Sequence, residues 1–185
     1  MKSGLDTQGI VELFASRGHF AYDGEGITQW QHAWQCRQLA RQAGASLALQ
    51  LAAWLHDVGH LMTGLDGTPT LLGHDDRHET LAAQALRPLF GAAVAEPVAL
   101  HVEAKRYLVG NSPGYRERLS PDSVRSLALQ GGAMNAVDCA AFLHKPYAAD
   151  AVRLRAWDDM GKQPAWQPGA DAAAELIALM RSVGP

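Results

Sequence analysis

The sequence predicts an all-α protein, and three observations lead to this prediction. Apolar residues recur at the three- and four-residue spacing of helices along most of the chain, and no segment shows the two-residue alternation of a half-buried strand. Residues typical of helix starts and stops bound these segments. The 185 residues suffice for a sizeable core, so residues 1–185 are expected to form a single domain.

Five helices are expected in the first part of the chain, at residues 7–17, at residues 28–44, from Ser46 through His56-Asp57, at residues 76–86 and at residues 93–107. The second helix begins with a capping box formed by Thr28 and Gln31. Ser46 caps the third helix and Asp76 caps the fourth, because their side-chain oxygens can accept from free backbone amides.

Four more helices are expected at residues 120–130, 135–144, 148–161 and 170–182. Ser120-Pro121 has the cap-then-proline order typical of a helix start, and Gly131-Gly132 ends that helix. The segment from Met62 to Asp75 contains three glycines and a proline, so it is predicted to be a loop. Its length is typical of an active-site lid.

Composition excludes several classes of function. The net charge of −3 gives no electrostatic basis for binding nucleic acid or an anionic membrane. Cys36 and Cys139 lie in neither a CxxC nor a zinc-binding spacing, which suits a reducing compartment. No segment has the apolar length of a membrane span or of a signal peptide, so a cytoplasmic protein is expected.

The dipeptide His56-Asp57 is the strongest sign of chemistry in the chain. It follows the apolar run from Leu47 to Leu55, so both side chains are expected to be buried. Burying an imidazole and a carboxylate without partners is unfavourable, and a metal ion would satisfy both. The spacing of His56 and His60 superficially resembles the HExxH zinc proteases, but Asp57 has a shorter side chain that suits direct ligation better than general-base work.

Other imidazoles and carboxylates on predicted helices complete a candidate ligand set: His32, His56, Asp57, His78, His101 and Asp158. Six such ligands exceed what one ion usually takes and suit two ions bridged by a carboxylate. The donors fit iron or manganese and, less distinctively, zinc. Each residue also has an ordinary interpretation, since a lone helical histidine is more often a packing or surface residue. Asp158 could likewise belong to a solvated helix face.

The order of these residues resembles the H…HD…D pattern of the HD-domain superfamily. Four segments further resemble the mixed-valent diiron oxygenases that cleave phosphonates, which are related to myo-inositol oxygenase; they are residues 22–29, 101–108, 127–134 and 155–158. The resemblance extends from about Tyr22 to Lys162. It implies an HD-domain helical bundle with a dinuclear metal site in its core.

The resemblance also implies roles for individual residues. One iron would be held by His32, His56, Asp57 and Asp158, and the other by His78 and His101, with Asp57 bridging a mixed-valent Fe(II)/Fe(III) pair. Tyr22 matches a tyrosine that occupies the second iron until substrate displaces it, and Glu25 matches an acid that receives the substrate amine. The groups around the phosphonate would be His60, Lys105, Ser123 and Arg155. Tyr22, His60 and Lys105 are expected to take part in the reaction itself.

Helical spacing supports the anion site independently. Lys105 follows His101 by one turn, and Arg155 precedes Asp158 by three residues, so each cation shares a helix face with a candidate ligand. Two cations beside a metal pair suit a phosphonate or a phosphate. The same residues could instead be ordinary solvated charges, and Tyr22 could be a packing residue.

The expected activity is cleavage of the C–P bond of a 1-hydroxyphosphonate with O2, giving a carboxylic acid and inorganic phosphate. The substrate could be (2-amino-1-hydroxyethyl)phosphonate, which gives glycine, or its N-trimethyl analogue, which gives betaine. A trimethylammonium group would need an aromatic cage, for which Trp30, Tyr107, Tyr115 and Trp166 are available. The resemblance also implies a 2-oxoglutarate-dependent hydroxylase that supplies the substrate.

Two alternatives remain open. An HD-type phosphohydrolase acting on a nucleotide or another phosphate ester would use the same ligands with a metal-activated water. A non-catalytic HD-like module would bind only a regulatory metal. His19, His74 and His144 have no assigned role and are expected on the surface or in loops.

Overall fold

The described regular secondary structure is helical, apart from one isolated bridge between Ala21 and Thr28. The structure is a computed structural model that describes residues 5–22, 24–64 and 73–184. Its helices are α1 (Thr7–Arg17), α2 (Gln29–Gln42), α3 (Leu47–Leu55), α4 (Val58–Thr63), α5 (His78–Phe90), α6 (Ala92–Asn111), η2 (Arg116–Arg118), α7 (Pro121–Leu129), α8 (Ala136–Leu143), α9 (Ala148–Met160) and α10 (Ala172–Val183). The predicted all-α class is confirmed.

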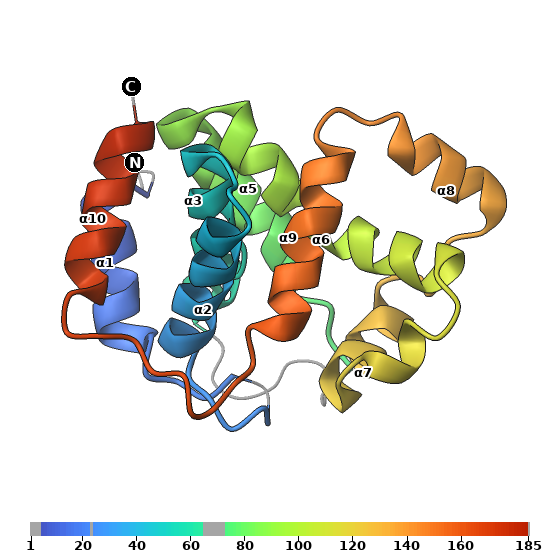
Figure 1. Cartoon of the computed structure of the whole chain (residues 1–185), viewed down its shortest axis with the longest axis horizontal. Helices are drawn as coiled ribbons and strands as arrows, with labels where there is room; N and C mark the ends of the chain where they lie inside the picture. Colours follow the sequence, from blue (N-terminus) through green and yellow to red (C-terminus); the bar gives the residue numbers. More distant parts are fainter. Residues whose placement is uncertain (1–4, 23, 65–72, 185) are drawn as a thin grey trace.

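The core lies around α3, which is apolar apart from Gln50. Leu51, Trp54 and Leu55 are fully buried, as expected for a mostly apolar helix. Figure 1 shows α2 and α3 in the middle of the molecule near α6 and α9, with α1 and α10 at one end and α7 and α8 at the other. The candidate ligands therefore come from central elements.

The predicted helix caps are largely correct. The side chains of Ser46 and Ser120 accept from amides in the first turns of α3 and α7. Thr28 Oγ1 accepts from the Gln31 amide at 3.1 Å, but the reciprocal half of the capping box is wrong. The Gln31 side chain instead donates to three backbone carbonyls between residues 163 and 166, which ties this segment to α2.

The expected continuous helix through His56-Asp57 is wrong. The chain breaks between α3 and α4, and His56 and Asp57 form the break itself. Asp57 has φ −99° and ψ 7°, outside the helical region. This local conformation directs the Asp57 carboxylate toward histidines from several helices.

The segment expected to form a lid, Met62 to Asp75, lies in part outside the described residues. Met62 and Thr63 belong to α4, and residues 65–72 are not described. Within the described part of the chain, His74 and Asp75 line the central cavity.

The predicted cap at Asp76 is correct in part. Arg77 with φ 50° directly precedes α5, but Asp76 Oδ1 accepts from the His78 amide at 3.3 Å. The Asp76 carboxylate also accepts from two imidazoles. Helices α5 and α6 extend to Phe90 and Asn111, beyond the predicted ends. Among the described helices, none has the combined length and apolarity needed to cross a bilayer. The expected cytoplasmic location stays a prediction.

Candidate dinuclear metal centre

The two carboxylate oxygens of Asp57 face two different groups of imidazoles. Oδ2 lies 3.4 Å from His56 Nε2 and 3.6 Å from His32 Nε2. Oδ1 lies 3.5 Å from His78 Nε2 and 3.7 Å from His101 Nε2. A carboxylate that presents one oxygen to each of two donor groups has the arrangement of a bridging ligand.

The first donor group comprises His32 from α2, His56 at the end of α3, Asp57 Oδ2 and Asp158 from α9. Asp158 Oδ1 lies 3.4 Å from His32 Nε2, and its Oδ2 lies 3.9 Å from His56 Nε2. Solvent reaches little of these side chains, since His32 and His56 are 0% exposed and Asp158 is 2% exposed. Residues up to 126 positions apart thus converge at one buried point.

The second donor group comprises Asp57 Oδ1, His78 from the start of α5 and His101 from α6. The Nε2 atoms of the two histidines lie 3.1 Å apart. The ring of His60 stacks on His78 at a centroid distance of 3.9 Å, and His60 Nε2 lies 4.0 Å from Asp57 Oδ1. His60 therefore lies close enough to Asp57 and His78 to share a metal ion with them.

Hydrogen bonds on the far side of the rings orient three of these imidazoles. His32 Nδ1 donates to the Gly161 carbonyl at 2.8 Å, His56 Nδ1 to Ala53 at 3.0 Å and His101 Nδ1 to Val98 at 2.7 Å. A proton on Nδ1 leaves the Nε2 lone pair free to bind a metal, as in most histidine metal sites. The donor set therefore fits metal ions at both groups.

Electrostatics also indicate that a cation belongs in the first group. Burial disfavours a charged His56, yet the carboxylates of Asp57 and Asp158 outweigh it and raise the pKa of His56 to about 10. Burial and nearby imidazoles hold the pKa of His101 well below its usual value, so this ring is neutral. Two buried carboxylates, of which Asp158 also pairs with Arg155, favour a positive charge between them, which a metal ion would supply.

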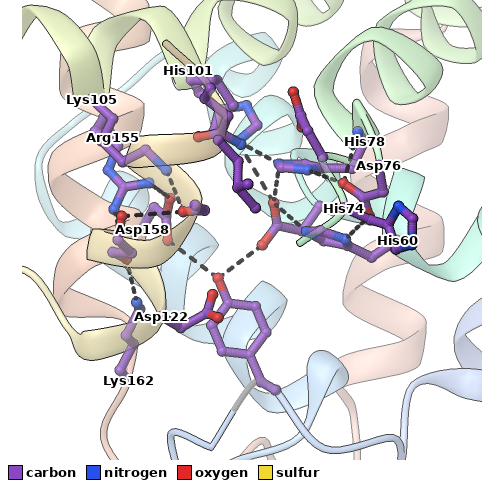
Figure 2. A pocket seen from close by; sticks show the side chains of 18 residues that line it. His60, His74, Asp76, His78, His101, Lys105, Asp122, Arg155, Asp158 and Lys162 are labelled. Carbon is purple, nitrogen blue, oxygen red and sulfur yellow. Dashed lines mark hydrogen bonds and ion pairs between the residues drawn. The ribbon is translucent and has the colours of Figure 1, made fainter. Parts of the chain in front are cut away.

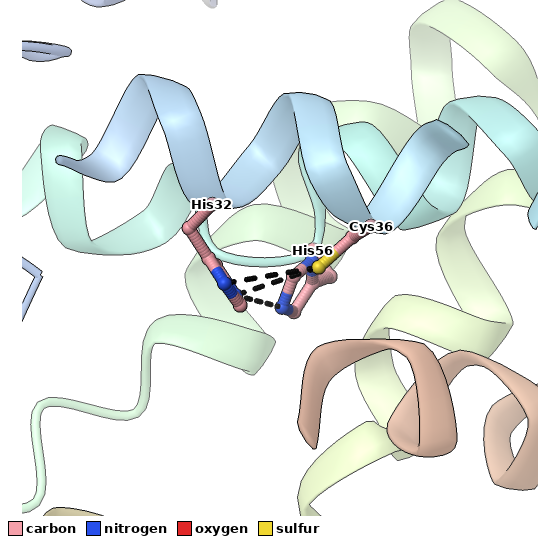
Figure 3. Close-up of side chains that lie close together, drawn as sticks. All are labelled: His32, Cys36 and His56. Carbon is pink, nitrogen blue, oxygen red and sulfur yellow. Dashed lines mark hydrogen bonds between the residues drawn. The ribbon is translucent and has the colours of Figure 1, made fainter. Parts of the chain in front are cut away.

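Cys36 lies beside the first group, close enough to share a metal ion with His32 and His56. Figure 3 shows its side chain next to His32 and His56, with Sγ 3.6 Å from His32 Nε2. Burial and the charges of Asp158 and Asp57 raise the pKa of the Cys36 thiol well above its usual value. In this neutral form the thiol donates to the Trp157 carbonyl at 3.6 Å.

Tyr22, from the segment before α2, packs against the first donor group. Its hydroxyl donates to Asp57 Oδ2 at 3.0 Å and lies 3.5 Å from Asp158 Oδ1, while its ring stacks on His32 at 3.9 Å. Both oxygens belong to the first group, although the resemblance implies a role at the second iron. Burial and these carboxylates raise the pKa of Tyr22, so the phenol is neutral here.

A small cavity of about 40 Å³ adjoins the donor groups. Figure 2 shows the side chains around it, with Lys105, Arg155 and Asp158 on one side and His60, His74 and Asp76 on the other. The predicted substrate residues His60, Lys105, Ser123 and Arg155 all line this cavity. Glu25 does not line it and pairs instead with Lys162 at 3.3 Å.

Each cation of the cavity has a protein partner. Lys105 Nζ donates to Ser126 Oγ at 2.7 Å, and the lysine is only 3% exposed. Arg155 Nη1 donates to Asp158 Oδ2 at 2.7 Å and Nη2 to Ser123 Oγ at 3.4 Å, with a further bond to Asp159. Arg155 thus links Ser123 to Asp158 of the first donor group.

The cavity-lining residues that sequence reasoning missed include Asp76, Ser126 and Lys162. His74 lies exposed in a loop, as expected, and it also lines the cavity. The missed residues carry no metal-ligand spacing, so only their proximity in the fold reveals them. None of the proposed cage residues Trp30, Tyr107, Tyr115 and Trp166 is among the residues that line the cavity.

Asp76 connects two sides of the site. Its Oδ1 accepts from His78 Nδ1 at 2.9 Å and its Oδ2 from His60 Nδ1 at 2.5 Å. One carboxylate therefore orients a candidate metal ligand and a candidate substrate residue. Both hydrogen bonds and both imidazole charges lower the pKa of Asp76 despite its burial, so Asp76 is ionised.

We expect Asp76→Asn to weaken metal binding by about 10- to 100-fold, as loss of a carboxylate behind a metal-bound histidine usually does. Metal titration by calorimetry would measure this effect. Asp138→Asn, at an exposed position on α8, is the control. Unchanged metal affinity in Asp76→Asn would mean that this carboxylate does not orient His78.

Comparisons with known proteins agree with this geometry. The family model of the HD domain matches residues 30–130. The chain is 45% identical over 154 residues to a hydroxymethylphosphonate dioxygenase of Gimesia maris, covering 83% of this chain and 76% of the relative. It is 37% identical over 166 residues to a [1-hydroxy-2-(trimethylamino)ethyl]phosphonate dioxygenase (glycine-betaine-forming) of Leisingera caerulea, covering 87% and 84%.

A third relative, the uncharacterized protein L432 of Acanthamoeba polyphaga mimivirus, is 34% identical over 156 residues, covering 83% of this chain and 71% of the relative. The matched HD-domain region contains five of the six candidate ligands, from His32 to His101. The chain belongs to the HD-domain family and, within it, to the group of phosphonate-cleaving dioxygenases.

Proposed function

We propose that the protein cleaves the C–P bond of a 1-hydroxyphosphonate with O2, giving a carboxylic acid and inorganic phosphate. The observation that supports this proposal is a cavity in which the cations Lys105 and Arg155 lie beside the two donor groups that share Asp57. The names of two relatives support this reaction class. Their substrates differ in the group attached to the carbon.

The proposed cofactor is a mixed-valent Fe(II)/Fe(III) pair. His32, His56 and Asp158 would hold one ion, His78 and His101 the other, and Asp57 would bridge them. The donors are imidazoles and carboxylates, a set that suits iron. When bound, such a pair supplies the activation of O2 and the redox chemistry of C–H and C–P cleavage. A 2-oxoglutarate-dependent hydroxylase is proposed to supply the hydroxylated substrate.

The protein residues would bind and orient the phosphonate. Arg155 and Lys105 would neutralise its oxygens, and the Ser123 hydroxyl would donate to it. His60, held by Asp76, would face the substrate from the opposite side of the cavity. Tyr22 covers the centre and would move away to open a coordination position.

An oxygen-uptake assay tests this proposal. The iron-loaded protein should consume one O2 for each phosphate released from hydroxymethylphosphonate or from (2-amino-1-hydroxyethyl)phosphonate, since one O2 added to either balances the acid and phosphate formed. The N-trimethyl analogue should be compared in the same assay. Phosphate-ester hydrolysis without oxygen uptake would instead favour the HD phosphohydrolase.

The pKa of Lys105 gives a prediction of pH dependence. Burial, with the nearby charge of Arg155, lowers the pKa of Lys105 to about 7. Because only the ammonium form attracts an anion, we expect methylphosphonate affinity to lose this contribution as pH rises through about 7. Lys105→Arg keeps its charge at all these pH values, so its affinity should lack that decline. The ratio of the two affinities cancels the ionisation of the ligand.

The same shift has a consequence for stability. An unfolded lysine has a pKa of about 10.4, so between pH 7 and that value the unfolded chain binds more protons than the folded protein. The free energy of unfolding should therefore gain a contribution as pH rises across this window, and lose it as pH falls through about 7.

The affinity measurement tests the role of Lys105. A ratio of wild-type to Lys105→Arg affinities that stays constant with pH would mean that the Lys105 ammonium does not bind the anion.

A further inference from the structure

Arg155 lines the cavity from α9, and two carboxylates of the same helix contact its guanidinium. Nη1 donates to Asp158 Oδ2 at 2.7 Å, whereas Nη2 donates both to Asp159 Oδ1 and, at 3.4 Å, to Ser123 Oγ. Nε is buried and has no hydrogen-bond partner among the described residues, so the guanidinium still has a donor to offer. Because Nη2 serves Asp159 and Ser123 together, the position of Asp159 affects the direction in which Nη2 points.

Tyr115 holds the Asp159 carboxylate from a different part of the chain. It lies between α6 and η2, 44 residues before Asp159, and its hydroxyl donates to Asp159 Oδ2. Tyr115 is 8% exposed, and burial raises the pKa of its phenol, so the hydroxyl keeps its proton and donates. Asp159 therefore accepts from Arg155 with one oxygen and from Tyr115 with the other. Neither Tyr115 nor Asp159 is among the residues that line the cavity, so both would act on a bound anion only through Arg155.

We propose that Asp159 and Tyr115 are positioning residues that hold the Arg155 guanidinium in the orientation that binds the phosphonate. Asp158 alone would not suffice, because an arginine paired only with Asp158 can turn both Nη atoms toward that carboxylate and away from Ser123. Asp159 keeps Nη2 beside Ser123. Tyr115 occupies the second oxygen of Asp159, which would otherwise be free to turn toward Arg155. This inference rests on the proposed function for the identity of the anion.

The charge of Asp159 and its position act in opposite directions on a bound anion. A carboxylate near the site repels an anion, so loss of its charge alone would strengthen binding. The Asp159 side chain is 20% exposed, however, and solvent screens part of that repulsion. Loss of its hydrogen bonds would release Nη2, and the planar donors of an arginine bind an oxyanion well only when they are held in a fixed direction. We expect the positioning effect to be the larger of the two.

Binding of methylphosphonate, which lacks the hydroxyl needed for reaction, tests this role in the metal-loaded protein. Tyr115→Phe should weaken its affinity about fivefold, the effect of one hydrogen bond, and Asp159→Asn should weaken it at least as much. Arg155→Lys keeps the charge but not the planar set of donors. In that background, Tyr115→Phe should cause no further loss. Calorimetry measures each affinity, and Tyr147→Phe, at a tyrosine that is 37% exposed, is the matched control.

Three results would overturn the proposal: unchanged affinity in Tyr115→Phe, stronger binding in Asp159→Asn, or the same fivefold loss from Tyr115→Phe when Arg155 is already lysine. The last result would mean that the tyrosine supports the fold in general rather than the arginine.

Steady-state kinetics supply a second measurement. Tyr115→Phe should raise KM about fivefold and leave kcat nearly unchanged, because Arg155 would bind the phosphonate equally before and during the reaction. A fall in kcat with unchanged KM would contradict a role in anion binding. Calorimetry does not depend on turnover, so the positioning role can fail while oxygen uptake succeeds. The expected affinity changes without oxygen uptake would instead contradict only the proposed reaction.

Discussion

Replacing Asp57 with asparagine is expected to weaken both metal ions at once and to abolish turnover. One oxygen of Asp57 faces each donor group, at 3.4 Å from His56 and 3.5 Å from His78. Asparagine keeps the shape of the side chain but removes its charge and turns one oxygen into an amide donor. Because a bound metal contributes several kcal/mol to catalysis, activity should fall by about 10³-fold or more.

Metal content after equilibration with iron, and the spectroscopic coupling between the two ions, would measure this change. Asp57→Ala should give the same result with a larger loss of packing, and Asp150→Asn, at a partly exposed position paired with Arg153, is the control. Loss of one ion with full retention of the other would mean that Asp57 does not bridge them.

The ligand set could be predicted because metal ligation depends on residue type and on the spacing of residues along helices. Buried imidazoles and carboxylates need partners, and the position of His56-Asp57 after an apolar run indicates that both are buried. The structure brings together all six candidate ligands, from five helices or helix junctions. Helix caps such as Thr28 and Ser120 were predictable for a similar reason, since each depends only on neighbours in the chain.

Features that depend on distant neighbours were not predictable. At the helix break, Asp57 contacts His78 and His101, which lie more than 20 residues away in the sequence. Asp76 resembles a helix cap in the sequence, but its carboxylate also accepts hydrogen bonds from two imidazoles on different helices. Glu25 was expected to bind a substrate amine, but in the structure it forms an ion pair with Lys162. In each case a residue that contacts the side chain is distant in the sequence and is brought close only by the tertiary fold.

Gly59 is expected to be nearly as sensitive as the ligands, although it has no side chain. It lies in α4, two residues after Asp57, and an ideal Cβ built on it would fall 2.1 Å from the His78 carbonyl oxygen and 2.8 Å from His78 Cα. These are backbone atoms at the start of α5, so they cannot rotate away. Gly59→Ala must therefore displace His78 from Asp57 and His101.

We expect Gly59→Ala to lower the free energy of unfolding by about 1–3 kcal/mol, the usual effect of overpacking. Better helix propensity of alanine, about 1 kcal/mol, offsets part of this loss. Turnover should fall by about 10²-fold, because a 1 Å displacement of a reacting group has that effect. Metal binding should weaken more at the His78 and His101 group than at the His32 and His56 group.

Gly169→Ala is the matched control, because a Cβ there meets no atom within 4 Å. Thermal unfolding and stepwise metal titration of both variants separate a local effect from a general one. Equal weakening of both ions would mean that the substitution disturbs the whole core rather than the start of α5. Wild-type metal affinity and turnover in Gly59→Ala would mean that α5 can shift without moving the His78 imidazole. We expect neither result, because α4 and α5 approach closely at Gly59 and His78. Gly59 lies only two residues from Asp57, so a movement of α4 also moves the carboxylate that lies between the two donor groups.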